Sequence, residues 1–509
     1  MDFGPPPARR GNGFRLVLAP DDMDGGMRRL FALSTTLVLA LGCGKDDDPN
    51  AGAECQLEAI DLSACQRSSL ASVQAEGVWN INVQLDDGSG AAGALRLSSP
   101  TGVPLALGMT VKERQVSENT FFLATEVKDS YEQTVRYAFA GCQALSPTRM
   151  AGIFRRCVDG KKDLQGTFDA VRVVRRAQEA EASGVELTAE VALPDGVVAT
   201  EVAVGGGRAF VAAGGEGFFI YDVSTPAQPR KVAQFNRAED KSYNDLLVNG
   251  DTLYVATQGG GIGVFDVSNP GAPARVRAVP DKAVEVTGLA LSGNLLFAAS
   301  PTPGAEVLIY DVTAPREPKL VTRYLVEGSD PAAGQMPLDV AVAGSRLYVS
   351  HWSYGLTVSD ITTPSKPKLL GRHGGSNSRT VAVGTIGNRT LAFDAGQDWG
   401  AHLRVLDVAI AESVTQVGEF RLRPEVSIRA LTLSGTRLYV AHYQDGLRVL
   451  DVAVPGETRQ VAYYNTWRES DAGRGVTFFD GLNAVAVSQD GYVYATDSSR
   501  GLLVFRETP

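Results

Sequence analysis

The sequence has few of the residues and patterns on which most enzyme active sites are built. Only four histidines, four tryptophans and five cysteines occur among its 509 residues. It contains no nucleophile elbow, phosphate-binding loop, H-E-x-x-H motif or dinucleotide fingerprint, and its glycine clusters at 205–208 and 259–263 lie in predicted hairpin turns. These absences argue against the common hydrolase, nucleotidase, metalloprotease and dehydrogenase classes.

The sequence also lacks a bilayer-length hydrophobic run, a helical hydrophobic period and an excess of basic charge. The apolar stretch at 30–42 is too short to cross a bilayer as a helix. A net charge of −10 and a pI near 5.1 argue against nucleic acid as a partner. The apolar residues instead form short, β-branched runs bounded by proline and glycine, which predicts an all-β protein.

What the sequence does contain is a repeat. The segment FFIYDVSTPAQPRKVAQF at 218–235 returns, with changes, at 262, 307, 356, 403 and 447. The aspartate that ends its third apolar run is Asp222, Asp266, Asp311, Asp360, Asp407 and Asp451 in successive copies. The steps of 44, 45, 49, 47 and 44 residues predict four-stranded β-propeller blades rather than a helical solenoid. Because this aspartate recurs in six copies, we interpret it as turn-forming rather than catalytic.

The number of hairpins predicts the number of blades. Hairpins that open a blade begin near residues 199, 243, 286, 337, 379, 428 and 482, which predicts seven blades. The seventh copy ends after its third strand, with Arg506 at the position of the repeated aspartate. The segment 185–194 resembles a fourth strand, so we expect it to complete the last blade and close the ring. The prediction is a seven-bladed β-propeller over residues 185–509.

Several copies resemble a known repeat family. The segments GGIGVFDVSNPGAP, GLTVSDITTPSKPKLLG and GLRVLDVAVPG resemble the LVIVD repeat, which occurs in bacterial surface proteins. Copies five to seven depart from this pattern, with Ala409 and Ala453 in place of its serine. The resemblance implies a propeller outside a bacterial cell, and it implies no set of catalytic residues.

The N-terminal region indicates export. Residues 1–26 are rich in proline and glycine, and we interpret them as a disordered extension or the product of a misassigned start codon. Residues 27–43 have the basic start and apolar core of a signal peptide. Their end, Ala-Leu-Gly-Cys, resembles a bacterial lipobox, which implies that Cys43 carries a lipid anchor. An ordinary cleaved signal is the alternative. A residue other than aspartate after Cys43 resembles the sorting rule for the outer membrane, so we expect that membrane or the cell surface as the location.

The remaining cysteines predict disulfides. Cys55, Cys65, Cys142 and Cys157 form an even set in a chain that we expect to be exported. Three pairings are open, and we favour Cys55 with Cys65 and Cys142 with Cys157 because these pairs close short loops. A zinc site would need a CxxC pair or a nearby histidine, which the sequence does not supply. Residues 44–75 would then form an acidic tether and a disulfide loop.

A second domain is predicted before the propeller. Residues 76–176 contain short alternating strands separated by polar turns, which predicts a small antiparallel β-barrel or sandwich. The segments 77–79 and 166–168 faintly resemble lipocalin-like barrels, and we interpret Trp79 as a core residue. Residues 177–184 would be a charged linker.

Polar and aromatic residues at repeated blade positions predict a candidate binding site at one mouth of the propeller channel. Three carboxylates stand five residues before a turn glycine: Glu201, Asp245 and Asp339. Three residues share a position nine residues before the repeated aspartate or its replacement: His351, His442 and Asp497. Five aromatic residues lie in nearby predicted loops: Trp352, Tyr354, Trp399, Tyr443 and Trp467.

These residues support two hypotheses. The favoured one is a membrane-anchored extracytoplasmic binding or scaffold protein without a cofactor, which presents a propeller face to a protein, peptide or glycan. Its polar mouth is then a solvated rim, since no spacing is a metal signature. The alternative is a metal-assisted hydrolase, similar to lactonases or esterases, which uses the acidic mouth with Ca²⁺ or another divalent cation.

Overall fold

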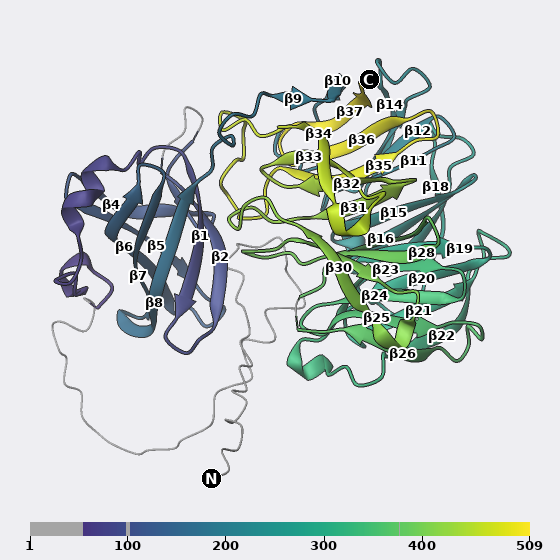
Figure 1. Cartoon of the computed structure of the whole chain (residues 1–509), viewed down its shortest axis with the longest axis horizontal. Coiled ribbons are helices and arrows are strands. Elements are labelled where there is room, and N and C mark those ends of the chain that lie inside the picture. The colour runs from purple at the N-terminus through teal and green to yellow at the C-terminus, as the bar shows by residue number, and fades with distance from the viewer. Residues whose placement is uncertain (1–53, 98–101, 376, 509) are drawn as a thin grey trace, which may run out of the picture. The chain divides into compact units, whose positions relative to one another are not determined.

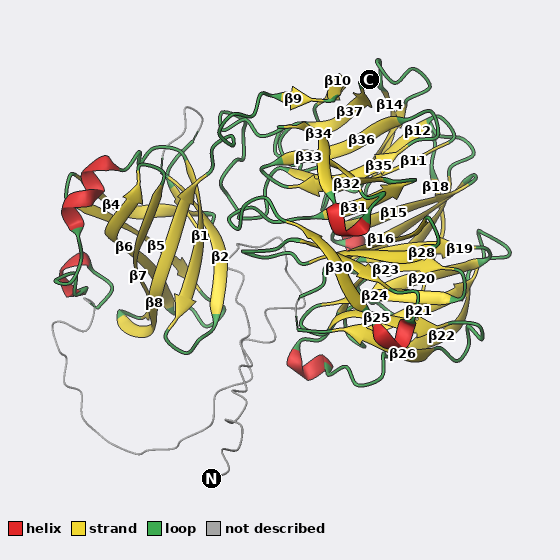
Figure 2. Ribbon diagram, in the orientation of Figure 1, coloured by secondary structure: helices red, strands yellow, loops and turns green. Residues whose placement is uncertain are grey.

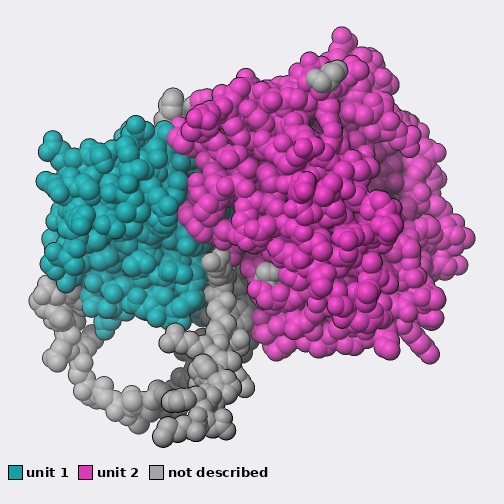
Figure 3. Space-filling view, in the orientation of Figure 1, with its two compact units in different colours: residues 1–173, 474–478 teal, residues 174–473, 479–509 magenta. Residues whose placement is uncertain are grey.

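A computed structural model describes residues 54–97, 102–375 and 377–508 (Figure 1). The regular secondary structure of the described chain consists of β-strands and a few short 3₁₀ turns, joined by loops (Figure 2). It divides into two compact units (Figure 3). Of the described residues, unit 1 holds those up to Val173 together with Arg474–Phe478, and unit 2 holds those from Val174 to Gly473 and from Phe479 onward.

Unit 1 is a closed, eight-stranded antiparallel β-barrel. Each strand pairs with the next one along the chain, and β8 pairs with β1 to close the barrel. The strands are β1 (Val78–Leu85), β2 (Gly90–Arg96), β3 (Leu105–Ala106), β4 (Met109–Ser117), β5 (Thr120–Lys128), β6 (Thr134–Ser146), β7 (Arg149–Val158) and β8 (Lys161–Arg172). The prediction of a small antiparallel β domain is confirmed, and of its two forms the barrel is the correct one.

The barrel interior is a packed hydrophobic core. Trp79 is completely buried, and its indole Nε1 donates a hydrogen bond to the carbonyl of Ala75 over 3.0 Å. The ring of Phe139 contacts those of Phe154 and Phe168, with centroids 5.2 and 5.6 Å apart. Large side chains therefore fill the interior, and Trp79 is a core residue, as predicted.

The disulfide pairing differs from the prediction. Cys55 is bonded to Cys157 and Cys65 to Cys142, so the two short loops that we expected are wrong. In the β6–β7 hairpin, Cys157 lies opposite Arg136 rather than opposite Cys142, so these two cysteines stand well apart along the strands. Each instead bonds to the segment that precedes the barrel.

That segment contains two 3₁₀ turns, η2 (Leu57–Ala59) and η3 (Arg67–Ser72), and is also held by arginines on the outside of the barrel. Arg136 Nε donates to the carbonyl of Cys55, and Arg155 Nη1 donates to the carbonyls of Glu54 and Ala59. Leu70 of η3 packs into the barrel core. The predicted disulfide loop is therefore a strap across the barrel wall.

Unit 2 is a seven-bladed β-propeller. The first six blades are β11–β14, β15–β18, β19–β22, β23–β26, β27–β30 and β31–β34, and the seventh is β35–β37 with β10. The first strands of successive blades contact one another around the whole circle, including β35 with β11, so they line the central channel. The predicted blade number is confirmed.

The strand bounds follow the repeat. In blades 1 to 3 they are β11 (Glu201–Gly205), β12 (Arg208–Ala212), β13 (Phe218–Asp222), β14 (Arg230–Phe235), β15 (Tyr243–Asn249), β16 (Thr252–Thr257), β17 (Ile262–Asp266), β18 (Ala274–Val279), β19 (Gly288–Ser292), β20 (Leu295–Ser300), β21 (Glu306–Asp311) and β22 (Lys319–Tyr324). In blades 4 to 7 they are β23 (Pro337–Ala343), β24 (Arg346–His351), β25 (Gly355–Asp360), β26 (Lys368–His373), β27 (Thr380–Ile386), β28 (Arg389–Ala395), β29 (Leu403–Asp407), β30 (Thr415–Phe420), β31 (Ala430–Ser434), β32 (Arg437–His442), β33 (Gly446–Asp451), β34 (Arg459–Tyr464), β35 (Leu482–Val487), β36 (Tyr492–Asp497) and β37 (Gly501–Glu507). Four 3₁₀ turns join them: η4 (Ala238–Asp240), η5 (Pro331–Ala333), η6 (Ala411–Ser413) and η7 (Pro455–Glu457).

The strand that precedes the propeller closes its ring. β10 (Val185–Val191) pairs with β37, and the two strands lie side by side in Figure 1. Arg500 fixes this junction, since its Nη2 lies 2.6 Å from Glu190 Oε2 and its Nε 3.0 Å from Oε1. β9 (Ala182–Ser183) pairs with β34 of blade 6, so the predicted linker is partly built into a blade.

The repeated aspartates have the turn-forming role that their recurrence predicts. Asp222 Oδ1 accepts hydrogen bonds from the backbone N–H and the hydroxyl of Ser224, over 3.0 and 2.6 Å. These bonds hold the pKa of Asp222 below its usual value. Serine or threonine makes the same pair of bonds in blades 2, 3 and 4. Asp407 and Asp451 stand two residues before an alanine, which has no hydroxyl, so of this pair of bonds they accept only the one from the backbone.

Antiparallel connections give the propeller two distinct faces. The turns at the repeated aspartates, between third and fourth strands, lie on one face together with the hairpins between first and second strands. We call it the Asp-turn face. The turns between second and third strands, and the connections between blades, lie on the other, which we call the loop face. The predicted candidate residues all come from the loop-face ends of strands or from the connections there.

Candidate functional site

One residue from each blade stands at the same level of the channel, near the loop face. In each blade this first-strand residue pairs with a residue of the second strand, and the second-strand residues are equivalent positions of the repeat. This mouth ring consists of Glu201, Asp245, Gly288, Asp339, Thr380, Ala430 and Ala484. The three predicted carboxylates are therefore brought to one level, in blades 1, 2 and 4.

Two of these carboxylates join neighbouring blades. Asp245 Oδ1 accepts from the N–H of Leu246 over 2.7 Å, and Oδ2 accepts from the N–H of Leu289 in blade 3 over 2.6 Å. Asp339 repeats the arrangement with its own neighbour and with Val381 of blade 5. Gly288 gives Asp339 room, because a Cβ there would lie 2.8 Å from Asp339 Oδ1.

Burial raises the pKa of all three carboxyl groups. The pKa of Glu201 rises to about 7, although the nearby charge of Arg429 opposes the shift. The pKa of Asp245 is raised well above its usual value by burial and then by the charges of Glu201 and Asp339. Burial likewise raises the pKa of Asp339, against the charge of Arg379. The mouth ring therefore carries less negative charge at neutral pH than its composition indicates.

A second ring lies one residue before the first and is made mainly of hydrogen-bond donors. Its members are Thr200, Asn244, Thr287, Leu338, Arg379, Arg429 and Asn483. Five of them donate to a backbone carbonyl of an adjacent blade: Thr200 to Tyr243, Asn244 to Val286, Thr287 and Arg379 to Leu338, and Asn483 to Ala199. This donor ring ties first strands together around the channel.

Two arginines of the donor ring were missed by the sequence analysis. Arg379 and Arg429 precede the first strands of blades 5 and 6, and Arg379 Nε donates to Gln397 Oε1 over 3.1 Å. Burial and the charge of Arg429 lower the pKa of Arg379 to about 10. The available signal was an arginine directly before two first strands. Only acidic residues at a fixed distance from the turn glycine were predicted as site residues, so these two arginines were not among them.

The two histidines occupy the same blade position but are enclosed. His351 is fully buried, its Nδ1 lies 3.3 Å from the carbonyl of Val349, and its ring meets that of Tyr354 edge-on at 5.8 Å. His442 is also buried, with Nδ1 3.8 Å from Asp445 Oδ2. Burial lowers the pKa of each histidine to about 4, so both are neutral at physiological pH.

Asp497, at the equivalent position in blade 7, closes a turn. Its Oδ1 accepts from the N–H groups of Ser499 and Arg500, and its Oδ2 accepts from the hydroxyl of Thr466 over 2.9 Å. The histidine positions and Asp497 thus belong to the turns between second and third strands rather than to the mouth ring.

A buried ion-pair network lies beside His442. Asp445 Oδ1 is 2.6 Å from Arg423 Nη2, and these charges hold the pKa of Asp445 low despite its burial. Arg448 is completely buried and pairs with Glu179 over 2.9 Å. Each charged group of this network has an opposite charge beside it, so removing one partner would leave an uncompensated buried charge.

The predicted aromatic residues differ in exposure. Trp352, Trp399 and Trp467 are partly exposed on the loop face, whereas Tyr354 and Tyr443 are buried. Arg372 lies over the ring of Tyr354 at 4.2 Å. The hydroxyl of Tyr443 accepts a hydrogen bond from Gln397, which links it to Arg379.

No cluster of ligands for a metal ion is found among the described residues: no three His, Cys, Asp or Glu side chains are grouped suitably. None of the helices in this part of the chain is long and apolar enough to cross a membrane. The signal segment and Cys43 lie outside the described residues.

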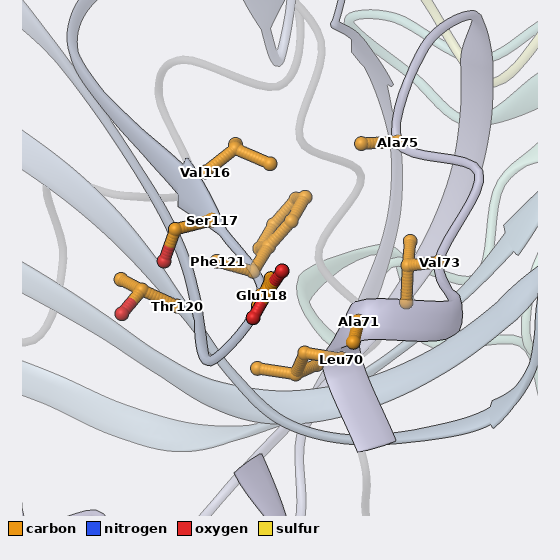
Figure 4. Close-up of a pocket in the computed structure, with 9 residues that line it drawn as sticks. All are labelled: Leu70, Ala71, Val73, Ala75, Val116, Ser117, Glu118, Thr120 and Phe121. Atoms are coloured by element: carbon orange, nitrogen blue, oxygen red, sulfur yellow. The ribbon is translucent and has the colours of Figure 1, made fainter. Parts of the chain in front are cut away.

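Unit 1 has a cavity of about 190 Å³ between η3 and the β4–β5 hairpin (Figure 4). Its lining is mostly apolar, with Leu70 and Phe121 facing it and Glu118 as its one ionisable residue. A lone carboxylate beside apolar groups offers no catalytic arrangement, and the candidate site remains at the channel mouth.

Comparison with known proteins supports the repeat assignment. The LVIVD repeat model matches residues 198–236, 242–280 and 336–373, and each match spans one four-stranded blade, blades 1, 2 and 4. The chain thus carries LVIVD repeats, as the sequence pattern predicted. No curated protein matches the chain.

Solved structures align with the chain at low sequence identity. The computationally designed Ika8 protein aligns at 12% identity and TM-score 0.42, covering 62% of this chain and 98% of its own. The WD40 β-propeller domain of Doa1 aligns at 10% identity and TM-score 0.48, covering 64% and 98%. A chain of a mitotic checkpoint complex aligns at 14% and 0.48, covering 66% and 99%.

Proposed function

We propose that the protein is an exported, lipid-anchored binding or scaffold protein whose propeller presents its loop face to a protein, peptide or glycan partner. The observation that carries this proposal is the use of the mouth carboxylates: Asp245 and Asp339 each hold two backbone N–H groups. Groups bound in this way stiffen the ring and are poorly placed to act as a base or as metal ligands. A rigid ring with varied loops on one face is suited to recognition.

Export is supported by the cysteines. Two disulfides that join distant parts of the chain require an oxidising compartment to persist. The lipobox resemblance at Cys43 and the LVIVD repeats favour attachment outside the inner membrane, at the outer membrane or cell surface. The anchor would leave both folded units free to meet a partner.

In-cell photocrosslinking would test the proposal. A photoreactive residue replaces Ala332, which is exposed on the loop-face connection of blades 3 and 4. Matched positions are Gln228 in an Asp turn and Val276 on an outer strand, both exposed. We expect partner adducts from position 332 and none from 228 or 276. Equal labelling from the three positions, or adducts confined to the controls, would contradict the proposal.

One observation keeps the hydrolase alternative open to test. A carboxyl group with a pKa of about 7, as in Glu201, suits proton transfer at neutral pH. Nitrophenyl esters and lactones, assayed with and without Ca²⁺, would reveal such an activity. We expect no turnover above that of a Glu201→Gln variant, and Glu201-dependent turnover would favour the enzyme.

A further inference from the structure

Arg429 is an exception in the donor ring. The other five polar members donate to a carbonyl of an adjacent blade. The side chain of Arg429 forms no hydrogen bond or ion pair with any described residue, although its backbone N–H is bound to the carbonyl of Ala441. A guanidinium carries five donors, so the partly buried Arg429 has donors available to a ligand at the channel mouth.

The surroundings of Arg429 leave space and add further donors. The mouth-ring positions in its own blade and in blade 7 are the small residues Ala430 and Ala484. Arg379 stands in the next blade, and the hydroxyl of Tyr443 accepts a hydrogen bond from Gln397, so its own proton is available to donate. With the pKa of Tyr443 raised to about 12 by burial, this hydroxyl stays protonated.

These groups face the same channel mouth. Gln397 accepts a hydrogen bond from Arg379 and donates one to the hydroxyl of Tyr443. Burial raises the pKa of Glu201 in blade 1, the charge of Arg429 in blade 6 opposes this shift, and the charge of Asp339 in blade 4 adds to it. Side chains of blades that are not adjacent can come together only across the central channel. The channel mouth thus has an acidic side in blades 1, 2 and 4 and a basic side in blades 5 and 6.

The basic side has the greater unused capacity. Asp245 and Asp339 already accept two hydrogen bonds each. Burial raises the pKa of both carboxyl groups, and the charges of Glu201 and Asp339 raise that of Asp245 further. Burial is the main cause of the lowered pKa of Arg379, and repulsion between Arg379 and Arg429 lowers it further. An anion between two guanidiniums would relieve this repulsion and accept charge-assisted hydrogen bonds.

We propose that the loop-face mouth of the propeller channel binds an oxyanion, a carboxylate or a phosphate group, through Arg429 with Arg379 and the hydroxyl of Tyr443. This inference rests on the proposed binding function and names the chemistry by which a partner is held. A carboxylate would come from an acidic peptide or glycan, and a phosphate from a phosphorylated ligand.

Calorimetry on the purified full chain, at constant ionic strength in sodium chloride, provides the test. The probes are succinate, inorganic phosphate and the uncharged succinamide. We expect succinate or phosphate to bind and succinamide not to bind, and whichever anion binds more tightly identifies the source of the oxyanion. Equal binding of succinamide, or binding of neither anion, would overturn the inference.

Variants localise the effect. Arg429→Gln should weaken anion binding roughly tenfold or more, since a hydrogen bond to a charged group is lost. Arg277→Gln, an exposed arginine on outer strand β18, is the matched control and should bind like the wild type. If Arg429→Gln fails to fold, Arg429→Lys keeps the charge and should show intermediate affinity. Unchanged affinity in a folded Arg429 variant would also overturn the inference.

Different results would contradict the proposed binding function and the proposed oxyanion site. Crosslinks at position 332 without any oxyanion binding would refute the oxyanion site and leave the binding function standing. Oxyanion binding lost in Arg429→Gln, with no loop-face crosslinks, would keep the site and refute the proposed presentation of this face to a partner.

Discussion

Asp339 of blade 4 accepts a hydrogen bond from the backbone N–H of Val381 in blade 5, with Oδ2 3.0 Å from the nitrogen. The same carboxylate accepts from Val340 in its own strand, so one side chain fastens two first strands together. An acidic residue that the sequence indicates as part of a ligand site is thus engaged in holding the ring.

Replacing Asp339 by alanine should destabilise the propeller. Two buried N–H groups would lose their acceptor, at a cost of about 1–3 kcal/mol in the free energy of unfolding. Urea unfolding followed by tryptophan fluorescence would measure it, since Trp352, Trp399 and Trp467 lie in unit 2. The exposed Asp281→Ala serves as control and should change stability by less than about 0.5 kcal/mol. An Asp339→Ala midpoint equal to that of the control would contradict the proposed fastening role.

Glu201 should make the stability of the propeller depend on pH. Its pKa rises from the ordinary 4.5 to about 7 on folding, so the folded state favours the protonated form. This contribution is fully present below about pH 4.5 and is lost as the pH rises through 7. Glu201→Gln, which cannot ionise, should therefore gain stability relative to the wild type by up to about 3 kcal/mol between pH 5 and pH 8.

Urea midpoints of the two proteins at pH 5 and pH 8 would check this expectation. Glu216→Gln, an exposed glutamate in a loop-face turn of blade 1, is a suitable control. A difference between Glu201→Gln and wild type that is the same at both pH values would refute the raised pKa.

The disulfide pairing can be determined by peptide mapping. Proteolysis without reduction and mass spectrometry should yield linked peptides that contain Cys55 with Cys157 and Cys65 with Cys142. Replacing both Cys65 and Cys142 by serine should lower the free energy of unfolding of the barrel by about 2–5 kcal/mol, because their disulfide closes a long loop. Recovery of a Cys142–Cys157 peptide would show that the hairpin register is wrong.

The lipid anchor has a separate test. Cys43→Ser should move the protein from the membrane to the soluble fraction, because acyl chains on this residue would be the proposed attachment. Cys65→Ser, which breaks the disulfide to Cys142 but keeps the lipobox cysteine, should remain with the membrane. Continued membrane retention of Cys43→Ser would rule out the anchor.

Much of the fold could be predicted because it is repeated. The recurrence of Asp222 and its equivalents sets the blade period, and the hairpins between these residues give the blade number, as confirmed by the seven sheets. Trp79 could be assigned to the core because a tryptophan in such a short strand is more often buried in the core than part of a ligand pocket. In both cases the signal lies in the residues of one strand or one repeat.

The rest depends on register, which the sequence does not display. Cys142 and Cys157 are close along the chain, but the pairing of Cys157 with Arg136 across the hairpin separates them. Arg429 was missed because it differs from the other donor-ring residues only in that its guanidinium has no partner among the described residues, which is known only from the structure. The histidines were correctly placed on one repeat position, but their complete burial depends on the packing of the turns around them.

The pairing of β10 with β37 has a consequence for how the molecule is made. Apart from the short β9, β10 is the first strand of unit 2 to leave the ribosome or a translocation pore. It can pair only after β37, the last strand of the unit, has also emerged, so the ring closes last. Contacts between such distant segments form late because of their entropic cost. A chain that stops short of β37 would keep one blade unfinished and its edge open to other strands. Ring closure therefore requires both ends of unit 2, and a chain truncated before β37 cannot close the ring.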